Sequence, residues 1–144
     1  MKKIFLILIS INIVLFADFI RNSTGVVTDS NTKLQWQDNY GLTSNGIEKA
    51  SWLGAINYCK NLKLDGGGWK LPNRNELLSI VDYKKYDPSI DKYVFKKTAS
   101  DDYWTSTTHA YRPSGAWIVN FYDGNSVYGD KSIYYYVRCV RSKR

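Results

Sequence analysis

Apolar and polar positions alternate near the start of the chain, follow a helical spacing in its middle and alternate again toward its end. The alternation over residues 18–39 is interrupted by a turn at Asp29–Asn31 and predicts a β-hairpin whose apolar face packs inward. Apolar side chains over residues 47–62 recur on one helical face and predict a first helix. A shorter run with the same spacing predicts a second helix over residues 74–82.

The C-terminal half is mainly β in pattern. A polar, irregular excursion over residues 83–102 comes first. Four segments rich in β-forming residues follow it, at residues 104–107, 116–121, 126–128 and 134–140. Asp123-Gly124 stands between two of them and is a strong hairpin signal. Helices segregated from a run of antiparallel strands predict an α+β fold in a single domain.

The start of the second helix is the most specific local pattern. Three glycines, Gly66–Gly68, precede a short extended piece at Trp69–Leu71, in which apolar residues flank a lysine. Pro72 disfavours helical angles at the residue before it and so ends the extended piece. Asn73 then suits the N-cap position, and Glu76 three residues later completes a capping box. We therefore expect a helix to begin directly after Asn73.

The N-terminus has the pattern of a secretory signal peptide. Lys2 and Lys3 precede an apolar run, Ile4–Phe16, which ends at the small residue Ala17. The run is shorter than the roughly 20 apolar residues that span a bilayer. We expect a signal peptide at residues 1–17, one domain at residues 18–144, and no stable membrane insertion after cleavage. An uncleaved N-terminal anchor is the alternative.

The net positive charge favours anionic partners but does not identify a particular one. Removal of the signal takes two of the twenty basic residues and none of the thirteen acidic ones, which leaves a net charge of +5. A positive excess attracts anions at long range. The basic residues are scattered, so an ordinary solvated surface is the alternative interpretation. Export disfavours a nucleic-acid role.

The chain has two cysteines, Cys59 and Cys139, and both follow the signal. An exported chain meets oxidising conditions, and two cysteines allow one intramolecular pairing. We predict a Cys59–Cys139 disulfide that ties the first helix to the last strand. The two positions lie 80 residues apart, so loop-closure entropy gives roughly 4–5 kcal/mol of stabilisation.

Catalytic and metal-binding patterns are weak. The single histidine, His109, has no evident nucleophile arranged with it, and an ordinary loop histidine is the simpler interpretation. Zinc needs clustered cysteine and histidine, and calcium needs 6–8 oxygen ligands. Four loop aspartates are the remaining candidates for a structural metal site, and they are Asp101, Asp102, Asp123 and Asp130. We predict no enzyme activity, no cofactor and no metal.

Six segments in order resemble one bacterial family. They are Val27–Gln37, Ala55–Cys59, Gly68–Leu77, Tyr103–Thr107, Phe121–Gly124 and Tyr136–Arg141. Together they look like the C-terminal domain of the Legionella collagen-like adhesin, a family whose members are mostly uncharacterised. The resemblance covers nearly all of the chain after the signal.

The resemblance implies a C-type-lectin-like fold related to the formylglycine-generating enzymes. Those enzymes use paired cysteines in catalysis, whereas both cysteines here are expected in the disulfide. In the adhesin this domain is implicated in binding sulfated glycosaminoglycans, and it forms trimers, so a homo-oligomer is among the expected states. Structural roles are expected for Trp69, Pro72, Glu76 and Arg138, with Glu76 as the carboxylate that pairs with an inward-facing Arg138.

Tyrosines of the C-terminal half, with nearby cations, form the candidate ligand surface. Tyrosine has an apolar ring face and a polar tip, which suits sugars and protein interfaces, and arginine suits sulfate or carboxylate. The expected ligand-binding residues are Tyr111, Arg112, Tyr128, Lys131 and Arg141. We expect an exported, non-catalytic module of the periplasm or cell surface that binds an anionic glycan. A module that binds an envelope protein is the alternative.

Overall fold

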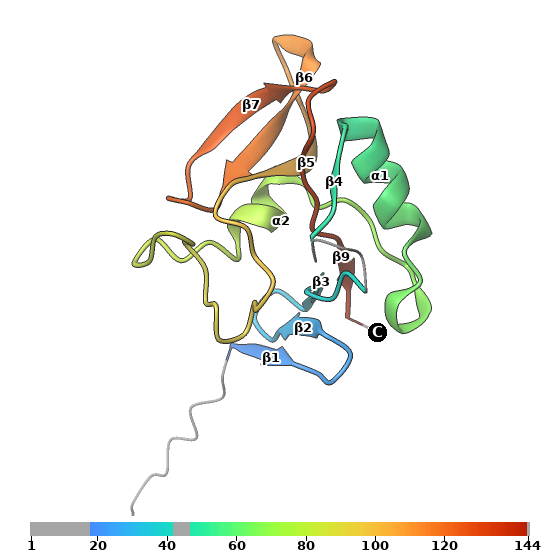
Figure 1. Ribbon diagram of the computed structural model, residues 1–144, viewed down its shortest axis with the longest axis vertical. Coiled ribbons are helices and arrows are strands. Elements are labelled where there is room, and N and C mark those ends of the chain that lie inside the picture. The colour runs from blue at the N-terminus through green and yellow to red at the C-terminus, as the bar shows by residue number, and fades with distance from the viewer. Residues whose placement is uncertain (1–17, 42–46, 144) are drawn as a thin grey trace, which may run out of the picture.

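The structure is a computed structural model that describes residues 18–41 and 47–143. Its strands form two sheets (Figure 1). The first has the order β1-β2-β3-β9, with β1 at Phe19–Arg21, β2 at Val26–Asp29, β3 at Leu34–Gln37 and β9 at Val140–Ser142. The second has the order β4-β8-β5-β6-β7, with β4 at Lys49–Ala50, β8 at Tyr135–Tyr136, β5 at Asp102–His109, β6 at Arg112–Asn120 and β7 at Ser126–Asp130. The expected signal peptide lies outside the described residues.

Helix α1 spans Trp52–Asn61 and packs beside β4 and β5 (Figure 1). The prediction that it begins at residue 47 is wrong, because Lys49 and Ala50 pair with β8 as strand β4. The helix begins after Ser51, whose hydroxyl accepts a hydrogen bond from the backbone N–H of Gly54. A strand of two residues is held by its distant partner, which no local pattern reveals.

Helix α2 spans Arg74–Leu78 and is shorter than the predicted range of residues 74–82. Its start is as predicted: the side chain of Asn73 accepts from the N–H of Glu76 at 2.8 Å, and that of Glu76 accepts from the N–H of Asn73 at 2.9 Å. After Leu78 the chain turns, and the N–H of Asp82 donates to the carbonyl of Ser89 at 2.9 Å. The helix therefore ends where loop contacts replace its own hydrogen bonds.

Replacement of Asn73 with alanine removes one half of this capping box. The expected result is a loss of about 1 kcal/mol in the free energy of unfolding, measured by urea denaturation. Asn57, an exposed helical residue, provides the control. Equal stability of Asn73→Ala and Asn57→Ala proteins would show that the cap does not hold α2 in solution.

The single strand predicted over residues 134–140 is instead two short strands in different sheets. β8 pairs with β4 and β5, whereas β9 pairs with β3. Between them, the N–H of Val137 donates to the carbonyl of Glu48, and the carbonyl of Cys139 accepts from the N–H of Gln37. This crossing segment links the two sheets.

Two apolar clusters form the core. One lies under α1 and includes Trp69, Trp104 and the disulfide; the other lies under α2 and includes Trp36 and Tyr103. The Cys59–Cys139 disulfide is present and joins α1 to the residue before β9, as predicted. The α+β class, with two helices and mainly antiparallel strands, is also confirmed. Trp69 and Pro72 are buried.

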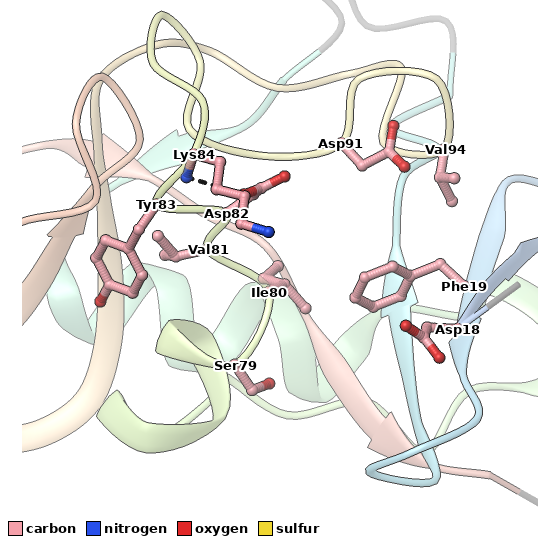
Figure 2. A pocket seen from close by; sticks show the side chains of 10 residues that line it. All are labelled: Asp18, Phe19, Ser79, Ile80, Val81, Asp82, Tyr83, Lys84, Asp91 and Val94. Carbon is pink, nitrogen blue, oxygen red and sulfur yellow. Dashed lines mark hydrogen bonds between the residues drawn. The ribbon is translucent and has the colours of Figure 1, made fainter.

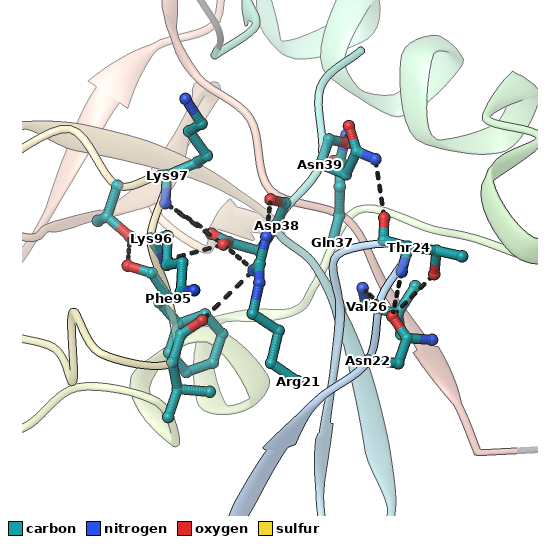
Figure 3. A network of polar contacts seen from close by, with 12 residues as sticks. Arg21, Asn22, Thr24, Val26, Gln37, Asp38, Asn39, Phe95, Lys96 and Lys97 are labelled. Atoms are coloured by element: carbon teal, nitrogen blue, oxygen red, sulfur yellow. Dashed lines mark hydrogen bonds and ion pairs between the residues drawn. The ribbon is translucent and has the colours of Figure 1, made fainter.

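The expected Glu76–Arg138 ion pair is wrong. Glu76 lies 3.1 Å from Lys70 instead. Arg138 is fully buried and pairs with Asp38, at 3.4 Å between Nη1 and Oδ1. Arg21 also pairs with Asp38, and the N–H groups of Lys96 and Lys97 donate to the same carboxylate (Figure 3). This carboxylate therefore joins β1, the segment between β3 and β4, the long loop before β5 and the crossing segment.

Tyr103 lies beside this charge network, with its ring centroid 5.8 Å from the Arg138 guanidinium. Burial raises the pKa of the Tyr103 hydroxyl, although the positive charge of Arg138 acts in the opposite direction. The neutral hydroxyl accepts a hydrogen bond from the N–H of Ala99 at 2.8 Å. It thereby fixes the end of the loop that leads into β5.

Candidate ligand-binding surface

Four aromatic rings gather at one end of the β5-β6-β7 sheet. Trp117 of β6 lies opposite Tyr128 of β7, so both side chains leave the same face of the sheet. The ring of His109 lies 5.0 Å from that of Trp117 and 4.9 Å from that of Tyr128. Tyr111 lies 6.3 Å from His109. We call these four side chains the aromatic surface.

Two arginines flank the aromatic surface. The guanidinium of Arg74, the first residue of α2, lies 4.2 Å from the ring centroid of Trp117, and its Nε donates to Ser126 Oγ at 2.9 Å. The guanidinium of Arg112 lies 5.0 Å from the ring centroid of Tyr128. Both arrangements are cation–π contacts, which orient the cations while leaving donors for a ligand.

The hairpin between β5 and β6 exposes this group. His109 pairs with Arg112, so Ala110 and Tyr111 form the turn, and Tyr111 is 92% exposed. The pairing shifts register between Thr108 and His109. Such an irregularity redirects the side chains that follow it, and here it precedes a ring contact between His109 and Tyr128.

Gly115 allows Tyr128 to lie close to the sheet. A Cβ atom at Gly115 would stand 3.2 Å from Cδ2 of Tyr128 and 3.2 Å from the carbonyl oxygen of Gly129. The backbone oxygen cannot move away as a side chain can. The glycine therefore fixes how near the ring stands to β6, and with it the spacing to the rings of Trp117 and His109.

The aromatic surface has the chemistry of a recognition site. Its ring faces offer flat apolar area, and Tyr128 is 42% exposed. The two guanidiniums offer fork-shaped donors for sulfate, phosphate or carboxylate. His109 Nδ1 is buried and has no hydrogen-bond partner among the described residues.

The structure brings Tyr111, Arg112 and Tyr128 together, but not the other two expected ligand residues. Lys131 lies on the α1 side of the sheet, 4.0 Å from the ring centroid of Trp52, and donates to Thr108 Oγ1 at 3.0 Å. Its ammonium group is thereby used within the fold.

Arg141 lies on β9 in the other sheet and is 6% exposed. Its Nη1 donates to the carbonyls of Gly67 at 2.6 Å and Asp65 at 2.9 Å, and the guanidinium stacks 4.3 Å from the ring centroid of Trp69. We therefore assign Arg141 to the packing of the turn before Trp69 and correct its expected place on the ligand surface.

Sequence reasoning missed Trp117, Arg74 and His109 as members of the surface. Alternation over residues 116–121 does not show which face of the strand is covered, and Trp117 is only partly buried. One signal was available: a hairpin centred on Asp123-Gly124 implies a cross-strand partner for Trp117 near Tyr128. Arg74 needed the position of α2, which the local sequence does not give.

A hollow of about 580 Å³ lies between β1 and the segment after α2 (Figure 2). Its wall is partly apolar, with Phe19 and Ile80 facing one another across it. Asp18, Asp82 and Asp91 stand around its rim. Lys84 also lines this hollow, but the three carboxylates outnumber it, so the lining is negative overall and does not suit an anionic ligand.

Over residues 18–41 and 47–143, no group of three or more histidine, cysteine, aspartate or glutamate side chains is arranged to hold a metal ion. Within the same residues, none of the helices has the length and apolar character needed to cross a bilayer.

The model of the Lcl C-terminal domain family matches residues 25–141 of this chain. The match covers most of the chain, and the chain therefore belongs to this family. No curated protein matches the chain in sequence. Membership of an adhesin-like family indicates a surface or binding module.

Proposed function

We propose that this domain binds anionic glycans through the aromatic surface. The observation that carries the proposal is the convergence of four rings and two guanidiniums, Arg74 and Arg112, at one end of the β5-β6-β7 sheet. Membership of the Lcl C-terminal family and the net positive charge favour the same class of ligand. The protein acts without catalysis, after export, in the periplasm or at the cell surface.

Each part of the surface has a role in this proposal. The exposed ring faces of Tyr111 and Tyr128 stack against the C–H faces of sugar rings. Arg112, which is exposed, forms charge-assisted hydrogen bonds to a sulfate or carboxylate. Arg74 holds Trp117 in place and adds positive potential. Because these ionic contacts are solvent-accessible, the affinity falls as salt screens them.

Replacement of Arg112 with alanine is expected to weaken binding to a sulfated oligosaccharide roughly tenfold, as the loss of one charge-assisted hydrogen bond implies. Titration calorimetry measures the change. Lys60→Ala removes an equal charge from the exposed face of α1 and is expected to bind as the unaltered protein does. Equal losses in the two variants would mean that only net charge matters, and would remove the aromatic surface from the account.

A protein partner is the second candidate, because apolar residues are exposed on β7 and in the segment that follows it. Val127 is 52% exposed, Ile133 47% and Tyr134 66%. Among the described residues, β7 is the last strand in the order of its sheet. Its outer edge can therefore pair with a strand of a partner protein. A partner isolated from the envelope whose binding is lost in Val127→Asp, together with no glycan binding, would favour this candidate.

A further inference from the structure

A second hollow with aromatic and basic walls lies in the long loop between α2 and β5. Its volume is about 320 Å³, within the range of small-ligand sites. Tyr86 and Tyr93 line it together with Lys84 and Lys92, and Ile90 contributes an apolar part of the wall. No residue of the aromatic surface takes part in it.

The loop that forms this hollow is held by backbone hydrogen bonds. The N–H of Asp87 donates to the carbonyl of Tyr122 at 2.8 Å, and the N–H of Ser89 donates to the carbonyl of Phe121 at 2.7 Å. Ile90 is 1% exposed and packs into the core under α2. The hollow is therefore preformed, so a ligand does not have to order the loop when it binds.

Exposed tyrosines stand around the hollow. Tyr86 is 76% exposed and Tyr93 82%. The ring of Tyr86 meets that of Tyr122 edge to face, with the centroids 6.5 Å apart, so the loop after β6 supports it. Aromatic area left open beside a hollow is typical of interaction sites.

The cations at the hollow differ in their availability. Lys85 lies 3.5 Å from Asp82 and 3.9 Å from Asp91. Lys84 and Lys92 form no ion pair with any described residue. Three lysines and one aspartate, Asp87, contribute to the lining, which is therefore positive overall. This balance contrasts with the hollow beside β1, where three carboxylates stand against a single lysine, Lys84, which lines both hollows.

We propose that this Tyr86–Tyr93 hollow is a second binding site, for one sugar unit that bears a sulfate or carboxylate. The ring stacks on Tyr86 or Tyr93, and the anionic group accepts from Lys84 and Lys92. The ligand class rests on the proposed function, whereas the site itself does not require the aromatic surface. A polymer that reaches both sites binds more tightly than either site alone, through effective concentration.

The two sites can be followed separately by NMR in the mature, oxidised protein. The probe is a sulfated, uronic-acid-containing disaccharide of the heparin type, added at low salt. The methyl groups of Ile90 report on the second site, and the indole N–H of Trp117 reports on the aromatic surface. We expect saturable shifts at both signals. In a Lys84→Ala/Lys92→Ala protein the Ile90 titration weakens at least tenfold, whereas the Trp117 titration is unchanged.

Lys60→Ala/Lys63→Ala is the matched control, since it removes two exposed lysines near α1, and amide spectra establish that both variants are folded. Shifts at Trp117 without shifts at Ile90 would overturn the second site and leave the proposed function in place. Shifts at Ile90 alone would support the second site and overturn the role of the aromatic surface. An Ile90 titration that weakens equally in both double variants would overturn the second site as well.

Discussion

Replacement of Asp38 with alanine is expected to lower the free energy of unfolding by about 3–5 kcal/mol, the cost of leaving a buried charge without its partner. Asp38 is fully buried, as is Arg138, which it faces at 3.4 Å. Its carboxylate also accepts from the N–H groups of Lys96 at 2.8 Å and Lys97 at 3.0 Å. The substitution therefore removes a charge and, at once, the side-chain acceptors of two backbone N–H groups.

Urea denaturation of the Asp38→Ala protein measures this loss. Asp101→Ala is the control, because Asp101 is exposed and its ion pair with Lys49 is 4.0 Å long, and such surface pairs contribute little. Asp38→Asn keeps an acceptor for the two N–H groups but removes the charge, so an intermediate loss is expected. A loss below 1 kcal/mol for Asp38→Ala would contradict the central structural role of this carboxylate.

Removal of the disulfide is expected to cost a similar amount. Cys59 and Cys139 close a loop with a sequence separation of 80, for which chain entropy gives about 4–5 kcal/mol. Both residues are fully buried, so alanine is the appropriate replacement. The Cys59→Ala/Cys139→Ala protein should unfold at lower urea concentration than the oxidised protein.

A reductant provides the control for this prediction. It should destabilise the unaltered protein and leave the double-alanine protein unchanged. If the double-alanine protein were as stable as the oxidised protein, the bond would contribute nothing to folding. The crossing segment between β8 and β9 would then be held by packing, by its backbone hydrogen bonds and by the Asp38–Arg138 pair.

Local signals in the sequence predicted the features that depend on neighbouring residues. The capping box of Asn73 and Glu76 is complete within four positions, and Asp123-Gly124 places the turn between β6 and β7. The disulfide followed from counting, because two cysteines allow one pair. Features of this kind need no knowledge of distant partners.

Features that depend on distant residues were missed. The strand β4 exists because Lys49 and Ala50 meet Tyr136 and Tyr135 of β8. Arg138 pairs with a carboxylate one hundred positions earlier, Asp38, rather than with Glu76. In both cases the chain path through two sheets decides the partner, and alternation of apolar residues carries no information about that path.

The candidate site was predicted only in part for the same reason: Tyr111, Arg112 and Tyr128 lie at the aromatic surface, whereas Lys131 and Arg141 do not. Tyr111, Arg112 and Tyr128 are near a turn or on an exposed strand, where tyrosine and arginine stand out in the sequence. Trp117 could not be recognised as a surface residue, because alternation marks a sheet face without showing whether a helix covers it. Here α2 is only five residues long, and Trp117 at the open end of that face stays partly exposed.

The most direct test of the account is a glycan array probed with the mature, oxidised protein and with its Arg112→Ala variant, at low and at physiological salt. We predict binding to sulfated or uronic-acid glycans that falls with salt and is reduced in the variant. Binding to neutral glycans alone, or anionic binding that neither salt nor the variant changes, would contradict anionic recognition at the aromatic surface.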